Sequence, residues 1–477
     1  MFHEMARRSL LQGAAAISVC SDAVRRFCGC PNGLTTGLAV EARKGFHHRG
    51  YLGWITDLAT DPDPTAAWPS MRLDERLLED YRQTFDLMKH LGFNEISIWG
   101  LYVSRSWPVA IRSAVDPKRG AMVEKLIDEA HQRGIRVYSG LGVYSWGFEE
   151  IIRAHPQLSR GNAQAMCASL PETWDWMQRV VDFVFARFAV DGVSMQSADQ
   201  GRCRCEQCKA HTDAQYHALL NTRTAEYIRS RYPGKTIGVT SWGLGFQDEN
   251  ALPVLTRMSK HIDYLIDVHD SSRRKDPAYR KKLIDALDCS FGTIGGPQVE
   301  PPQHWARDRW FLPTPQRTAR HLQQLFTDGG RACEYFSHIL ANPGDEISFW
   351  MAGKALADPL TPWETHLKSC VEELYGTTTS AACEGLAQVF LEAEEAYMRY
   401  LPQDHCGTIS LEPLVSNRAG PPIYLAERLS QSQREAYGRR LESIKRALRK
   451  LAPVVPRKDK IVRILRCIEG CRETMVR

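Results

Sequence analysis

The chain has 477 residues, of which 43% are hydrophobic and 25% are charged, a balance typical of a globular protein with a large core. Its net charge of +5 is too small to indicate a nucleic-acid partner. No apolar run reaches the roughly 18 residues that a membrane-spanning helix needs, so we expect no stable membrane span. The length suits one barrel of about 250–350 residues with additional elements.

The N-terminus carries the pair Arg7-Arg8, followed by the weakly apolar run 13–19. This arrangement resembles a twin-arginine export signal, which implies a periplasmic or secreted protein and the twin-arginine export machinery as a partner. We therefore assign residues 1–30 to a signal segment. The alternative is a basic N-terminus that has no targeting role.

From about residue 48 onward, short β-rich runs alternate with longer helical patterns, which predicts parallel strands joined by crossover helices. In the first of these helices Leu78, Tyr81, Phe85 and Met88 recur on one face, and Gly92 follows as a helix-ending glycine. The predicted strands are 50–57, 95–99, 135–141, 192–196, 236–242, 264–269, 290–294 and 332–336.

Eight strand–helix units in succession predict a (β/α)8 barrel over residues 48–361, the expected catalytic domain. The last barrel helices are expected to begin near Pro313 and Glu346. An open doubly wound sheet is the alternative, and it fits less well because no glycine-rich phosphate motif follows the first strand. Residues 362–477 are predicted to form a helical C-terminal region.

In such a barrel the active site lies at the C-terminal ends of the strands. The polar and aromatic residues at these predicted ends, or just beyond them, are Asp57, Tyr102, Arg105, Tyr144, Trp146, Gln196, Ser197, Asp199, Gln200, Trp242, Asp267, His269, Asp270, Gln298, Glu334 and Tyr335. Pyranose rings stack their C–H faces on aromatic side chains, and their hydroxyls pair with carboxylates and amides. The set therefore favours a glycoside hydrolase.

Two other hydrolase classes lose support, because no G-x-S-x-G elbow stands at a strand end and no H-E-x-x-H motif occurs. A barrel hydrolase that uses a catalytic metal on His269 and neighbouring carboxylates is a further alternative. It is weakly favoured, because His269 is the one histidine at a strand end in that group.

Residues 191–199, which run into Cys203-x-Cys205-x-x-Cys208, resemble the strand-four signature of a bacterial family of exported α-glucuronidase-like and hexosaminidase-like barrels, a domain of unknown function. The stretches that resemble the remainder of that family are 49–51, 333–335, Trp350, 357–359 and 373–376. The resemblance spans residues 48–400. It implies action on a glycosidic bond of a poly- or oligosaccharide, with no cofactor required for catalysis.

The chain departs from this pattern at its most informative point. Hexosaminidases of this type carry an Asp-Glu pair after strand four, and the Glu is the general acid. Here Asp199 is followed by Gln200, and an amide cannot donate a proton as an acid. We take Asp199 and Glu334 as the candidate catalytic carboxylates, and the departure also motivates a non-catalytic, carbohydrate-binding barrel as the alternative function.

The expected substrate-binding residues are Asp57, Tyr102, Trp146, Gln196, Gln200, Trp242, Asp267, His269 and Tyr335. If Asp199 and Glu334 act as a pair across the barrel mouth, we expect the wide carboxylate spacing of about 6.5–9.5 Å that leads to inversion. Alternatively, an acetamido group of the substrate serves as the nucleophile, and one carboxylate suffices.

Each of these residues also has a structural interpretation. Asp199 could cap the loop after strand four, and Glu334 could pair with a barrel arginine. Asp267 and His269 could form a hydrogen-bonded pair, Asp57 could be buried against backbone amides, and the two tryptophans could belong to the core.

The chain holds 14 cysteines, and Cys203, Cys205 and Cys208 are followed closely by His211. Four Cys or His ligands around a tetrahedral ion are typical of structural zinc, and Cys-x-x-Cys is its common half-site. Cys167 is an alternative fourth ligand to His211 if its loop folds over the barrel top. A disulfide is equally compatible with an oxidising compartment, and free thiols are the third possibility. Any such clamp would be structural.

Overall fold

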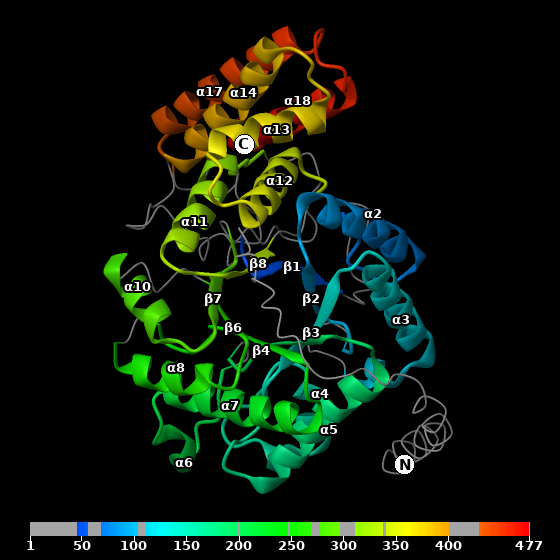
Figure 1. The fold of residues 1–477 in the computed structure, drawn as a ribbon, viewed down its shortest axis with the longest axis vertical. Helices are drawn as coiled ribbons and strands as arrows, with labels where there is room; N and C mark the ends of the chain where they lie inside the picture. Colours follow the sequence, from blue (N-terminus) through cyan, green and yellow to red (C-terminus); the bar gives the residue numbers. More distant parts are fainter. Residues whose placement is uncertain are drawn as a thin grey trace, which may run out of the picture. The chain divides into compact units, whose positions relative to one another are not determined.

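A computed structural model describes residues 45–55, 68–103, 111–198, 201–246, 249–268, 277–295, 311–336, 340–399 and 429–476. Eight parallel strands follow one another in chain order around a closed barrel, and β1 pairs with β8 to complete it. Figure 1 shows these strands at the centre, with helices around them. The prediction of a (β/α)8 barrel is confirmed.

The strands lie close to their predicted positions. They are β1 (His48–Trp54), β2 (Glu95–Trp99), β3 (Arg136–Gly142), β4 (Gly192–Gln196), β5 (Thr236–Thr240), β6 (Tyr264–Asp267), β7 (Ser290–Thr293) and β8 (Ala332–Phe336). In the register of the barrel, Gly50 of β1 stands opposite Glu95 of β2 on one side and Glu334 of β8 on the other.

Helices cover the outside of the barrel between these strands. They are α2 (Glu75–Leu91), α3 (Pro117–Gln132), α4 (Glu149–Ala154), α5 (Pro171–Arg187), α6 (Glu206–Lys209), α7 (Asp213–Arg231), α8 (Leu252–Ser259), α10 (Pro277–Ala286), α11 (Pro315–Thr327) and α12 (Pro343–Ala357), with short 3-10 turns at Ile111–Val115, Pro156–Leu158 and Glu249–Ala251.

Capping residues fix where these helices begin and end. Asp74 caps α2 by accepting a hydrogen bond from the backbone N–H of Leu77 at 3.1 Å, and Gly92 ends the same helix at φ 87°, where a side chain would be strained. Helix α12 begins earlier than predicted, because Asn342 caps it and Pro343 takes its first turn.

The C-terminal region consists of α13 (Trp363–Tyr375), α14 (Ser380–Met398), α17 (Gln431–Leu451) and α18 (Lys458–Val476) in the part of the chain that the structure describes. Figure 1 shows them grouped beside α11 and α12. Glu394 of α14 accepts hydrogen bonds from the backbone N–H groups of Gln316 and Arg317 in the first turn of α11, at 3.0 and 2.9 Å. Among the helices described, none is long and apolar enough to cross a bilayer.

Glycines inside the barrel make room for large rings. A Cβ atom at Gly238 of β5 would lie 2.1 Å from the ring of Tyr264, and one at Gly140 of β3 would lie 2.4 Å from the ring of Trp99. Because alternate strands contribute alternate layers of side chains to a barrel interior, these glycines let bulky residues from the even-numbered strands reach the barrel axis.

Candidate functional site

The N-terminal end of the barrel is closed by an ionic group around Glu95 of β2. Its carboxylate lies 3.2 Å from Nδ1 of His48 and 2.7 Å from the guanidinium of Arg136, and it accepts a hydrogen bond from the Tyr138 hydroxyl at 2.9 Å. This end of a barrel carries residues that stabilise the fold, so we assign the group a structural role.

Glu334 lies in the middle of the barrel, in a layer built from the even-numbered strands. Its carboxylate accepts hydrogen bonds from Ser97 of β2 at 2.7 Å, from Ser194 of β4 at 3.2 Å and from the hydroxyl of Tyr264 of β6 at 2.7 Å. The side chain is almost fully enclosed, with the residue 1% exposed. Burial raises the pKa of the Glu334 carboxyl, and the three hydroxyl donors oppose that rise.

The layer above Glu334 is aromatic and apolar apart from one amide. Two residues further along the same four strands stand Trp99, Gln196, Ile266 and Phe336, which the two-residue period of a strand turns to the same interior face. All four are buried. Glu334 is therefore separated from the C-terminal mouth by a full layer of side chains.

Trp54, at the end of β1, extends this aromatic layer toward the mouth. Its ring centroid lies 5.9 Å from that of Trp99 and 6.5 Å from that of Phe336. Trp146, in the loop after β3, contacts Trp99 edge-on at 5.0 Å. Trp54 is partly exposed and Trp146 is 1% exposed, so Trp54 offers a ring face while Trp146 supports its neighbour.

The remaining predicted substrate-binding residues that the structure describes differ in their burial and in their neighbours. Trp242, just after β5, is half-buried. Tyr335 packs against Phe349 of α12 at 5.8 Å, which places it on the outer face of β8. Asp267 at the end of β6 is fully buried, 3.5 Å from the hydroxyl of Ser241. Tyr102, beyond β2, is also buried.

Several predicted site residues lie outside the described residues: Asp57, Arg105, Asp199, Gln200, His269, Asp270 and Gln298. The pairing of Asp199 with Glu334, and the carboxylate spacing expected for it, therefore stay predictions.

His217 of α7, which lies behind the end of β4, belongs to no motif and was not predicted from the sequence. The residue is 3% exposed, and a Cβ atom at Gly243 would lie 2.5 Å both from its ring and from the Cβ of Ala198. Burial lowers the pKa of His217 to about 4, against an opposing effect of the charge on Asp213. A neutral imidazole thus lies beside the residue that precedes Asp199 in the chain.

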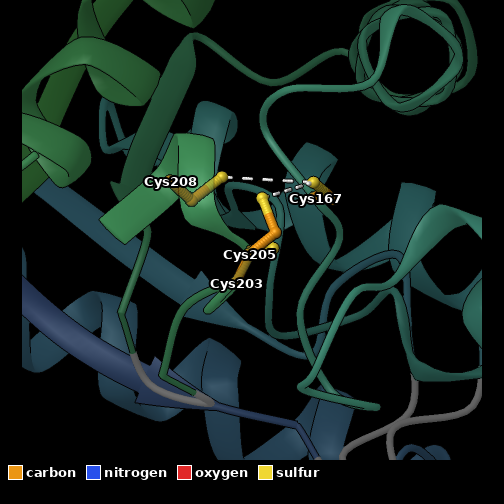
Figure 2. Close-up of side chains that lie close together, drawn as sticks. All are labelled: Cys167, Cys203, Cys205 and Cys208. Carbon is orange, nitrogen blue, oxygen red and sulfur yellow. Dashed lines mark hydrogen bonds between the residues drawn. The ribbon is translucent and has the colours of Figure 1, made fainter. Parts of the chain in front are cut away.

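The cysteine motif folds into a compact cluster of thiols, to which we refer as the thiol cluster: Cys167, Cys203, Cys205 and Cys208 (Figure 2). Their sulfur atoms all lie within 4.8 Å of one another. Cys167 comes from the loop between β3 and α5, whereas the other three precede or lie in the short helix α6. His211 is exposed and is not among the clustered ligand atoms, so Cys167 stands where the sequence had suggested His211.

Comparisons with known proteins show the fold. No protein-family model matches the chain, and no curated protein matches it by sequence. A GH138 enzyme targeting the pectin rhamnogalacturonan II is similar in structure with a TM-score of 0.58 and 12% identity, over 91% of this chain and 57% of that enzyme. The chain thus spans a little over half the length of that enzyme.

Two further solved structures have more distant folds. An O-GlcNAc hydrolase mutant from Thermobaculum terrenum has a TM-score of 0.48 at 11% identity, over 86% of this chain and 77% of that one. A beta-N-acetylhexosaminidase has a TM-score of 0.45 at 12% identity, over 69% and 76% of the two chains. The chain therefore has a (β/α)8 barrel similar to one found in a glycoside hydrolase.

Proposed function

We propose that the protein is a glycoside hydrolase that cleaves a glycosidic bond of a poly- or oligosaccharide at the C-terminal mouth of its barrel. The observation that carries the proposal is the partly exposed ring of Trp54 at the end of β1, which lies on the buried aromatic layer of Trp99 and Phe336. An indole face of this kind binds the C–H face of a pyranose.

The fold likeness supports a carbohydrate substrate, since the similar GH138 enzyme targets a pectin. Pectic oligosaccharides therefore belong among the first substrates to test, beside the glucuronides and N-acetylhexosaminides that the sequence resemblance implies. Trp54 and Trp242, which lie at strand ends and are partly exposed among the residues that the structure describes, are the proposed ring-stacking residues.

Asp199 is the proposed acid, because it follows the end of β4 at Gln196 by only three positions and the C-terminal ends of the strands form the mouth of a barrel. Glu334 was predicted as its partner, but its burial and its three hydroxyl donors support a role in holding the barrel interior. A reaction in which the substrate's acetamido group attacks the anomeric carbon requires only one carboxylate at the leaving oxygen.

The test is a screen of aryl glycosides and pectic oligosaccharides with the wild type, Asp199→Asn and Glu334→Gln, together with sugar binding by calorimetry. Removing a general acid costs about 100-fold or more in turnover. We expect that loss for Asp199→Asn with binding retained. We expect Glu334→Gln to lower thermal stability more than turnover, and Glu95→Gln is the comparison variant in the neighbouring group toward the N-terminal end of the barrel.

Two outcomes would overturn these assignments. Full activity in Asp199→Asn would remove Asp199 from the mechanism. A loss of about 100-fold in Glu334→Gln, with the melting temperature and sugar affinity of the wild type, would make Glu334 the catalytic residue instead.

A carbohydrate-binding barrel without hydrolytic activity is the second candidate. The enclosure of Glu334 beneath a layer of side chains favours it, as does the glutamine at position 200. Measurable sugar binding by the wild type, with no turnover on any sugar in the screen, would favour this candidate.

Export by the twin-arginine route fits a polysaccharide substrate outside the cytoplasm, and we propose it from Arg7-Arg8. Fractionation of cells that express the full chain tests it. Full-length protein found only in the cytoplasm, with no effect of replacing Arg7 and Arg8 by lysine, would exclude this route.

A further inference from the structure

The thiol cluster brings together sulfur atoms from segments that are far apart in the chain. Cys167 is separated from Cys205 by 38 positions and from Cys208 by 41, yet its sulfur lies 3.7 Å and 4.0 Å from theirs. Three of the four cysteines are buried, and Cys205 is half-buried. Figure 2 shows the side chains of Cys205 and Cys208 directed at that of Cys167, and the sulfur of Cys203 belongs to the same group of four.

These distances match a tetrahedral metal site. Zinc binds thiolate sulfur at about 2.3 Å, and the edge of a tetrahedron with that radius is about 3.8 Å. The sulfur–sulfur distances of 3.7 and 4.0 Å lie close to that edge, and the remaining ones stay within 4.8 Å. One ion can therefore contact all four sulfur atoms after small movements of the side chains.

Contacts between the four thiols cannot by themselves explain the stability of the thiol cluster. A thiol is a weak donor and a weak acceptor, so four thiols that face one another stabilise a loop only slightly. All four are free cysteines, so no disulfide joins them in the structure. Four soft ligands of one kind at this spacing are instead the donor set that structural zinc prefers.

Neighbouring groups suit the charge of such a site, because four thiolates around one dication carry two negative charges. The Ser169 hydroxyl lies 2.9 Å from the sulfur of Cys167 and 3.6 Å from that of Cys205, where it can donate to a thiolate. At the edge of the thiol cluster the guanidinium of Arg202 donates to the backbone carbonyls of Cys208 and His211 and pairs with Asp213 at 2.7 Å, which holds the backbone around Cys208 in place.

We propose that Cys167, Cys203, Cys205 and Cys208 form a structural zinc site. Since the protein supplies all four ligands, the ion has no open position for a substrate, and its role is to join the loop after β3 to the loop after β4. The chain from Gln196 to Cys203 includes Asp199. Under the proposed function, the zinc would therefore also restrict the loop that carries the acid.

Metal analysis of the full-length protein, purified without a metal-affinity step, tests the site directly and independently of any activity. We expect about one zinc per chain in the wild type. Cys167→Ser and Cys205→Ser should each bind zinc at least about tenfold more weakly in competition with a chromogenic chelator. Cys289→Ser is the matched control, since Cys289 is half-buried and lies outside the thiol cluster. It and His211→Ala should keep full zinc.

Replacing zinc by Co²⁺ gives a second measurement, because four thiolates around tetrahedral cobalt produce intense visible absorption. We expect this spectrum in the wild type and a weaker, shifted one in Cys167→Ser. Circular dichroism must show that each variant keeps the fold. Absence of metal with all four thiols titratable would overturn the proposal, as would a disulfide within the thiol cluster found by mass spectrometry. Zinc retained by Cys167→Ser but lost by His211→Ala would overturn the ligand set.

Discussion

The layer around Glu334 gathers four side chains from four strands, and the thiol cluster gathers four from two segments, but the two groups differ in what completes them. Around Glu334, three hydroxyl donors from β2, β4 and β6 meet one carboxylate acceptor of the same chain. In the thiol cluster, four groups of one kind face one another at sulfur distances such as 3.7 Å.

The chain therefore supplies all the partners that the Glu334 layer needs, but it does not supply suitable partners for the four thiols. A buried carboxylate with matched donors is satisfied internally, so its layer forms whenever the barrel folds. Four thiols make poor partners for one another, so under the proposed zinc site their cluster would gain most of its stability from the bound ion. The barrel interior should therefore be insensitive to metal supply, whereas the loops above β3 and β4 should depend on it.

The largest expected effect comes from removing the acceptor of the barrel layer. Glu334→Ala leaves three buried hydroxyl groups without their acceptor and opens a cavity, so we expect the free energy of unfolding to fall by about 4 kcal/mol. Urea unfolding followed by circular dichroism measures it. Glu334→Gln should cost less, because its carbonyl oxygen still accepts. A loss under about 1 kcal/mol in Glu334→Ala would show that the Glu334 carboxyl group does not stabilise the barrel interior as the shared acceptor of the three hydroxyl groups.

His217 allows the pH dependence near the β4 loop to be separated from that of the rest of the fold. Burial lowers its pKa from 6.5 to about 4, so its neutral form stabilises the folded state above pH 6.5. That contribution is lost as the pH falls toward 4, and it amounts to on the order of 3 kcal/mol. We expect the difference in the free energy of unfolding between the wild type and His217→Gln to become smaller as the pH falls across this range, which urea unfolding at several pH values measures.

Glu394 changes the free energy of unfolding in the opposite direction over nearly the same pH range. The pH dependence of the wild type alone therefore cannot be assigned to His217. Burial raises the pKa of Glu394 to about 7, and its contribution to stability is lost as the pH rises through that value. Glu394→Gln is therefore the matched variant. A difference between wild type and His217→Gln that does not change between pH 4 and 7 would contradict the assignment of His217.

Tyr264→Phe removes a single donor from the Glu334 layer and keeps the ring that Gly238 accommodates. Leaving a buried acceptor without one of its donors costs about 1–3 kcal/mol, and we expect the free energy of unfolding to fall by about 2 kcal/mol. Chemical unfolding in the presence and absence of a zinc chelator should give the same difference. If the difference in the free energy of unfolding between the wild type and Tyr264→Phe depended on the chelator, the barrel interior and the thiol cluster would not be energetically independent.

Ser169→Ala is the corresponding change at the thiol cluster, where a hydroxyl lies beside two sulfur atoms. Loss of a group that hydrogen-bonds a metal ligand typically lowers metal affinity by about 10–100-fold, and we expect the lower end of that range. Competition with a chromogenic chelator measures it. Stability measured without zinc should barely change, and an equal loss with and without zinc would assign Ser169 to ordinary loop packing.

The sequence by itself determined the barrel. Strands β2, β4 and β8 and helix α7 have the predicted bounds, because the alternation of β-rich runs with helical periodicity is a local property that survives without knowledge of neighbours. The start of α12 was missed by three positions, since its cap is Asn342 rather than the more acidic segment that follows.

Tertiary structure alone decided the surroundings of the candidate site residues. Glu334 lies one layer below the mouth because the register of β8 against β1 sets its depth, and register cannot be read from one strand. The same register places Trp99, Gln196 and Phe336 together in the layer above it. Cys167 joins the thiol cluster because its loop folds beside α6, a long-range contact that motif spacing does not encode, whereas His211 is nearer in sequence and points to solvent.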